Sequence, residues 1–157
     1  MKILFIATGK TDAPYLLEAI GLYCKRLEHY LPFDMLAIPA ARQVKNLPES
    51  RQKEKEGEQI VKALEAGDYV VLLDEKGNEY TSLQFAAYME KKMSAAPRRL
   101  VFVAGGPYGF SDAVYRHAAE KISLSKMTFS HQMIRLLFVE QLYRAMTILH
   151  NEPYHHE

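Results

Sequence analysis

Short apolar runs alternate with helical patterns along this chain. Runs typical of buried strands occur at Ile3–Ala7, Met35–Ile38, Tyr69–Leu73 and Leu100–Ala104, with a weaker fifth at Lys121–Leu124. Residues spaced as on an amphipathic helix separate most of these runs. Such alternation indicates an α/β fold with a mostly parallel sheet and helices on both faces. The 157 residues fit one compact domain, so we expect a single domain over residues 1–157.

Capping residues predict where several helices begin and end. Thr81, followed three residues later by Gln84, resembles a capping box. Ser111 and Ser130 are suited to cap the starts of two later helices. Gly67 is placed to end a charge-rich helix before the third strand.

The helix expected at His131–His150 is unusually apolar. When it is projected at 100° per residue, the polar stripe contains only Glu140, Arg144 and Thr147. The remaining side chains point in too many directions to be buried against one sheet face. A second copy of the chain would cover them, so we predict a homodimer; a helix wedged inside the monomer is the alternative.

Charge and cysteine content narrow the classes of function. Twenty basic and nineteen acidic residues give a net charge of +1, so any nucleic-acid contact must be a local patch. Cys24 has no second thiol to pair with or to share a metal, which fits a buried residue in a reducing cytoplasm. The first apolar run is far shorter than the about 20 residues of a membrane span, and no signal-peptide pattern follows it. We expect no membrane contact and no metal.

Two common nucleotide-binding motifs are missing. Gly9-Lys10-Thr11 follows the first strand, but a phosphate-binding loop needs a glycine at position 4, where this chain has Leu4. The glycine fingerprint of dinucleotide-binding folds is also missing after that strand. A hydrolase or phosphotransferase should show a true phosphate loop or an acidic metal-binding pair, and neither is convincing here.

Glycine segments follow two of the predicted strands. Leu73–Gly77 follows one strand, and Gly105–Gly109, with the sequence GGPYG, follows another. Ligands of open α/β sheets bind beyond the carboxyl ends of the strands, and a glycine there lets a ligand approach the backbone. The structural alternative is a pair of tight turns.

A third segment, Leu124–His131, is a loop rich in small hydroxyl residues whose backbone groups suit the reading of a base. The segments LLDEKG, VFVAGGPYGF and ISLSKMTFSHQMIRLLFVEQLYRA, in this order, resemble the ribosomal large subunit methyltransferase H family of the SPOUT superfamily. The likeness spans the chain, from MKI and ATGK through KEKEGEQI to NEPYHHE.

The resemblance implies a single-domain SPOUT fold with a C-terminal trefoil knot that holds S-adenosylmethionine. It also implies methylation of N3 of a pseudouridine in the helix 69 loop of 23S rRNA within the ribosome. The motifs alone also allow a dimeric ligand-binding module without catalysis. By resemblance, the cofactor would be bound by Leu73, Gly105, Leu124, Ser125, Lys126, Met127, Thr128 and Phe129.

Methyl transfer from a sulfonium is a displacement on an activated carbon, so it requires alignment rather than a metal. The acceptor nitrogen must lose a proton, which needs a nearby acceptor. His131 stands at a helix start, where the dipole favours a neutral imidazole, although it could merely hydrogen-bond the loop. The full set of candidate acceptors is His131, His155, His156, Glu140 and Asp74.

RNA contact would come from local basic and aromatic groups. Glu140 is placed to pair with Arg144, which offers a structural role for that arginine. After Pro153 ends the last helix, the tail would reach the pocket of a partner subunit, where Tyr154 and His155 would act in catalysis; a disordered end is the alternative. The candidate RNA contacts are Arg42, Lys45, Arg98, Arg99, Arg135, Arg144 and His156, with Tyr154 and His155 beside them.

Overall fold

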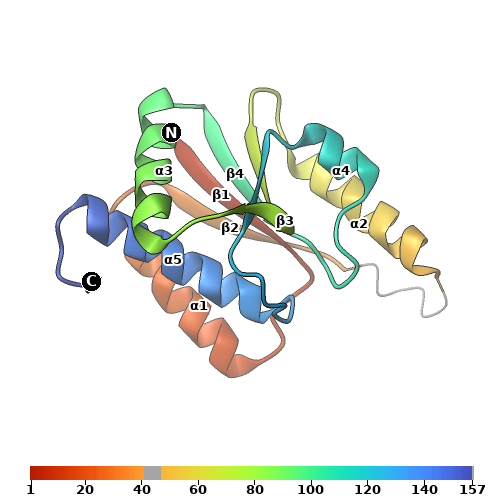
Figure 1. Cartoon of the computed structure of the whole chain (residues 1–157). Helices are drawn as coiled ribbons and strands as arrows, with labels where there is room; N and C mark the ends of the chain where they lie inside the picture. The colour runs from red at the N-terminus through yellow and green to blue at the C-terminus, as the bar shows by residue number, and fades with distance from the viewer. Residues whose placement is uncertain (41–46, 157) are drawn as a thin grey trace.

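The computed structural model describes residues 1–40 and 47–156, and its centre is a five-stranded sheet (Figure 1). The strand order is β2-β1-β4-β3-β5, and every neighbouring pair is parallel. Each predicted strand is confirmed. The strands are β1 (Lys2–Thr8), β2 (Phe33–Ile38), β3 (Tyr69–Glu79), β4 (Arg99–Ala104) and β5 (Glu120–Ser123).

Helices cover both faces of the sheet, as the alternating pattern predicted. In Figure 1, α1, α3 and α5 lie on one face, and α2 and α4 lie on the other. The five-stranded parallel sheet with helices on each side confirms the α/β architecture. The helices are α1 (Pro14–Leu27), α2 (Glu49–Ala63), α3 (Ser82–Ala95), α4 (Asp112–His117) and α5 (Met133–Leu149).

Side chains of the central strands alternate between two cores. In β1, Ile3 and Phe5 pack with α1, α3 and α5, whereas Leu4 and Ile6 pack with α2 and α4. The ring of Phe138 in α5 lies 4.6 Å from the ring of Phe5, centroid to centroid, and is fully buried. Burial of such a side chain stabilises the fold by about 2–3 kcal/mol, so α5 is fixed firmly against the sheet.

Helix ends follow the predicted caps with one exception. Thr81 and Gln84 form the capping box of α3, and Ser111 Oγ accepts the N–H of Val114 at the start of α4. Ser130 Oγ accepts the N–H of Met133, so it satisfies the first turn of α5 from just outside the helix. The prediction for Gly67 is wrong: α2 ends at Ala63, and Gly67, with φ of +88°, lies in the turn before β3.

The third strand is longer than predicted. β3 continues past Leu73 to Glu79, because pairing with β5 resumes at Asn78 opposite Ile122 after a shift of register. The segment after Leu73 is therefore extended rather than a tight turn. This extension carries Asp74 along the end of the sheet.

The packing of α5 favours the wedged helix that was the alternative to dimer burial. α5 packs between α1 and α3 over the sheet, and Phe138, Leu142 and Met146 are fully buried within one chain. Thr147 was expected on a polar stripe, yet it is fully buried and its hydroxyl donates to the carbonyl of Arg144 at 2.7 Å. Leu137 is half-buried and lies outside both core clusters. The homodimer stays a prediction.

No helix within residues 1–40 and 47–156 is long and apolar enough to cross a membrane. The trefoil knot stays a prediction, since strand order and pairing do not define how the chain threads. The assignment of residues 1–157 to a single domain stays a prediction as well.

Candidate cofactor and active site

A cleft of about 700 Å³ lies at the edge of the sheet where β4 and β5 end and where β3 continues past Leu73. This volume is within the range of small-molecule sites. Its walls come from the extension of β3, the glycine segment after β4, the loop after β5, α4 and the first turns of α2 and α5. Because neighbouring parallel strands end at the same edge, segments that are far apart in sequence meet here.

Of the residues expected to bind the cofactor, all except Lys126 line this cleft. The loop after β5 is shaped by its own hydroxyl groups: Ser123 Oγ donates to the carbonyl of Ser125, and Ser125 Oγ accepts the N–H of Met127. These two hydrogen bonds fix the conformation of the loop backbone where it lines the cleft. The lining members of the expected set are Leu73, Gly105, Leu124, Ser125, Met127, Thr128 and Phe129.

Gly105 is closely surrounded by its own segment. A Cβ on Gly105 would lie 3.2 Å from Cε1 of Phe110 and 3.3 Å from the carbonyl oxygen of Gly109. The atoms that an added Cβ would meet first therefore belong to the same loop, at Gly109 and Phe110. Gly109, with φ of +80°, closes the turn by donating its N–H to the carbonyl of Gly106 at 3.2 Å. The glycines thus define the shape of this wall.

Helix α2 supports the glycine segment from behind. A Cβ on Gly106 would lie 2.6 Å from Oε2 of Glu56, a buried carboxyl group whose pKa is raised by that burial. A Cβ on Gly57 would lie 2.2 Å from Oγ of Ser111. The glycine segment and the Ser111 cap therefore pack directly against α2. This close packing leaves the glycine segment little room to shift.

Asp74 and Tyr115 meet at the mouth of the cleft, which both line. The Tyr115 hydroxyl donates a hydrogen bond to Oδ2 of Asp74, and the N–H of Lys76 donates to Oδ1 at 2.9 Å. Burial and the bond to Asp74 raise the pKa of Tyr115 to about 12, so its hydroxyl remains a donor at neutral pH. The carboxylate is thus held in one orientation.

His131 also lines the cleft and is half-buried. Burial, and then the nearby charge of Arg135, lower the pKa of its imidazole, so the ring is neutral at pH 7. A neutral ring can accept a proton. No residue in the described ranges makes a hydrogen bond with this ring.

The C-terminal tail is packed against its own chain rather than frayed. The N–H of Glu152 donates to the carbonyl of Thr147 at 2.9 Å, and the Tyr154 hydroxyl donates to Oε1 of Glu140 at 3.1 Å. Glu140 lies about two turns into α5, and neither Tyr154 nor His155 lines the cleft. In Figure 1 the chain end lies at the opposite end of α5 from the loop that precedes this helix.

The predicted RNA contacts fall in different places. Arg42 and Lys45 lie outside the described residues. Arg135 is 1% exposed and donates to the carbonyls of Thr8 and Gly9, so a single chain does not present its guanidinium to phosphates. Arg144 forms the predicted ion pair with Glu140 at 2.6 Å and lies over the ring of Tyr154, and His156 is exposed.

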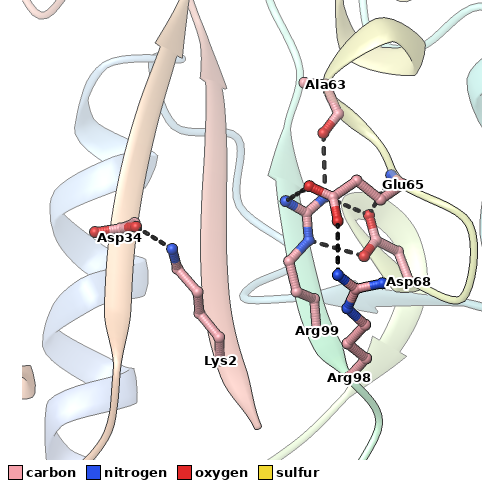
Figure 2. Close-up of polar contacts among 7 residues, drawn as sticks. All are labelled: Lys2, Asp34, Ala63, Glu65, Asp68, Arg98 and Arg99. Carbon is pink, nitrogen blue, oxygen red and sulfur yellow. Dashed lines mark hydrogen bonds and ion pairs between the residues drawn. The ribbon is translucent and has the colours of Figure 1, made fainter.

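Arg98 and Arg99 lie at the opposite end of the sheet from the cleft, where β4 begins (Figure 2). Arg99 is bound by the carboxylates of Glu65 and Asp68 and by the carbonyl of Ala63. Its guanidinium is therefore occupied by structural contacts. Lys2 and Asp34 form a separate exposed ion pair in the same region of the sheet.

Several lining residues were not identified from the sequence, among them Tyr115, Glu49 and Lys53. A signal for Tyr115 was present: the Ser111 cap starts a helix directly after the glycine segment, so that helix must lie at the same edge. In the described ranges, no group of three or more His, Cys, Asp or Glu side chains is arranged to hold a metal ion.

Comparison with known proteins agrees with this geometry. The sequence family described as predicted SPOUT methyltransferase matches residues 1–155, nearly the whole chain. The chain belongs to this SPOUT methyltransferase family. SPOUT methyltransferases take the methyl group from S-adenosylmethionine, which agrees with a small-molecule cleft at the strand ends.

Relatives resemble this SPOUT methyltransferase along its full length. A protein of Parabacteroides distasonis is 70% identical over 157 residues, covering 100% of both chains. Proteins of Bacteroides thetaiotaomicron and Porphyromonas gingivalis are 57% and 54% identical over the same length, again covering 100% of both chains. All three relatives are named ribosomal RNA large subunit methyltransferase H.

Proposed function

We propose that this enzyme methylates the RNA of the large ribosomal subunit, at N3 of a pseudouridine in the helix 69 loop of 23S rRNA. The observation that carries the proposal is the meeting of the three family-like segments around one cleft. The names of its full-length relatives support ribosomal RNA as the substrate. Ribosomes as substrate would place the enzyme in the cytoplasm.

The residues of the cleft fit S-adenosylmethionine. Leu73, Leu124 and Phe129 offer apolar contacts for an adenine ring, and the loop at 124–129 offers backbone groups for its hydrogen bonds. Carboxylates at the mouth suit a ligand that carries a positive charge. When bound there, the cofactor would supply an activated methyl group. Lys126, whose side chain is exposed, would then contribute backbone or act on RNA.

The chain's own groups would align the base and remove its proton. Of the predicted acceptors, His131 and Asp74 lie in the cleft of the same chain. Tyr154 and His155 would take part only on the pocket of a second copy, because Glu140 and Arg144 of their own α5 bind them outside the cleft of their own chain. The proposed active site is therefore composite, with the cofactor on one subunit and Tyr154 and His155 from the other.

Apolar side chains that are not buried within one chain support the proposed homodimer. Leu137 is half-buried outside the core clusters, and α1 exposes Tyr15 at 70% and Leu17 at 60% of their surfaces. Large apolar groups left exposed on a small protein favour association with a second copy. RNA would then be held by Arg42, Lys45, Arg144 and His156 rather than by the buried Arg135.

The test is methyl transfer from labelled S-adenosylmethionine to ribosomes isolated from cells in which the gene of this protein is deleted. Label should appear in 23S rRNA at one pseudouridine, located by mass spectrometry of nuclease fragments. Ribosomes from unaltered cells are the control and should accept little label. Binding of S-adenosylmethionine without any transfer would favour a ligand-binding module, and label in another RNA would refute the proposed substrate.

A further inference from the structure

The cleft contains one carboxylate that is fixed on both oxygens. Glu49, Asp74, Glu75 and Asp112 all line it. Among these four side chains, hydrogen-bond donors of the described residues reach both oxygens only at Asp74, through the Tyr115 hydroxyl and the N–H of Lys76. Two elements thus determine where this carboxylate points: the β3 extension, which carries Lys76, and α4, which carries Tyr115.

The fixed carboxylate keeps accepting capacity for a ligand. Each carboxylate oxygen can accept two hydrogen bonds, and each oxygen of Asp74 receives one from the protein. Asp74 follows Leu73 directly and is half-buried at the mouth of the cleft. A ligand bound beside Leu73 would therefore lie next to a hydrogen-bond acceptor, the Asp74 carboxylate, whose orientation is already fixed.

His131, the other predicted proton acceptor in the cleft, has fewer contacts that would position it. No described residue makes a hydrogen bond with the His131 ring, whereas both oxygens of Asp74 receive one. An acceptor whose position is set before binding is more effective than one that must be ordered during the reaction. The geometry therefore favours Asp74 over His131 as the proton acceptor.

We propose that Asp74 accepts the N–H hydrogen of the base that receives the methyl group, and that Tyr115 positions its carboxylate for this task. The inference rests on the proposed function, because it requires a base with an N–H at the reacting atom. An imide such as uracil or pseudouracil has this hydrogen at N3, whereas cytosine has an unprotonated N3. Asp74 is thus a specificity-determining residue as well as a proton acceptor.

The N–H bond breaks and its proton passes to the Asp74 carboxylate. The electron pair left on nitrogen forms the new bond to the methyl carbon. The carbon–sulfur bond breaks with its pair staying on sulfur, which loses its positive charge. The proton then leaves the carboxyl group for solvent, so no further reactant is needed.

Four variants test the assignment: Asp74→Asn, Asp74→Glu, Tyr115→Phe and the control Tyr88→Phe. Tyr88→Phe removes a comparable bond from a tyrosine hydroxyl to a carboxylate, 2.6 Å to Glu120, away from the cleft. Each protein is assayed for kcat and KM with the unmethylated ribosomes. Each is also titrated with S-adenosylhomocysteine by calorimetry, which measures the cofactor site without turnover.

Asp74→Asn should lower kcat by about 10²- to 10⁴-fold, the usual contribution of a positioned acid or base. Its KM and its affinity for S-adenosylhomocysteine should stay near wild type. Asp74→Glu should recover part of kcat, because it restores the carboxylate. Tyr115→Phe should lower kcat by roughly 10- to 100-fold, because it leaves the carboxylate misaligned. Tyr88→Phe should retain the wild-type kcat.

Wild-type kcat in a folded Asp74→Asn variant would overturn the inference while the proposed function stands. An equal loss of S-adenosylhomocysteine affinity would also overturn it, since Asp74 would then be a cofactor contact. Failure of Asp74→Glu to exceed Asp74→Asn would remove the proton-accepting role. If the wild-type enzyme does not label ribosomes at all, it is the proposed function that fails.

Discussion

Gly77 of β3 lies directly against the backbone of Ile122 in β5: a Cβ on Gly77 would be 2.5 Å from the nitrogen of Ile122. Such a distance cannot be relieved by rotation of a side chain, because the opposing atoms are backbone. The contact brings the β3 extension across β5 at the edge where the cleft opens. It links the stability of the fold to the position of Asp74.

Gly77→Ala should therefore destabilise the protein by about 1–3 kcal/mol, the usual result of forcing atoms into a packed region. Urea unfolding at fixed protein concentration measures the change. Gly21→Ala is the matched control, since no atom lies within 4 Å of a Cβ there and α1 should gain stability. Equal midpoints for wild type and Gly77→Ala would show that the strands separate without cost.

Gly105→Val should weaken binding of S-adenosylmethionine, because a branched side chain would push Phe110 and the turn at Gly109 out of place. Gly105→Ala adds only one carbon at 3.2 Å and should keep more of the affinity. Calorimetry gives both dissociation constants, and circular dichroism checks the fold. A folded Gly105→Val variant with wild-type affinity would remove this segment from the cofactor site.

Leu137→Glu should convert the proposed homodimer to monomers. The side chain is half-buried and outside the core clusters, so a charge there should disturb association more than folding. Sedimentation velocity at micromolar concentration reports the change, and Leu83→Glu, at an exposed leucine of α3, serves as control. A wild-type protein that sediments as a monomer would refute the dimer itself.

Deletion of Pro153–Glu157 should abolish methyl transfer to ribosomes while S-adenosylhomocysteine binding stays near wild type, because the tail lies outside the cleft of its own chain. Some stability should be lost with the Tyr154 bonds to Glu140 and Tyr23. Tyr154→Phe separates the two effects by removing only the hydroxyl. Full activity of the truncated enzyme would show that the tail has no part in the reaction.

Acid should release the contact between Asp68 and Arg99. Burial by itself would raise the pKa of Asp68, but the hydrogen bonds from Arg99 prevail and lower it below the usual value. A lowered pKa means that the stabilisation is present above about pH 4, the ordinary pKa of Asp, and is lost as pH falls through the folded-state value. Asp68→Asn should cost about 2 kcal/mol at pH 7 and reduce the acid dependence of unfolding. An unchanged pH profile would contradict this account.

The strand and helix pattern could be predicted from the sequence because it depends on local spacing and capping. Apolar runs such as Leu100–Ala104 and the Thr81 cap act over a few residues, so their structural meaning is carried by neighbours in the chain. The glycine and hydroxyl segments could be placed at one edge for the same reason: each directly follows a strand.

Only the tertiary structure decided which groups meet at that edge and which are buried. Arg135 is a candidate RNA contact when only the sequence is considered. Folding instead brings it to the carbonyls of Thr8 and Gly9, 127 and 126 residues away. Tyr115 reaches Asp74 across 41 residues because α4 packs beside the end of β3. These contacts depend on strand order and on the register between β3 and β5, which are set by long-range packing and have no local signal along the chain.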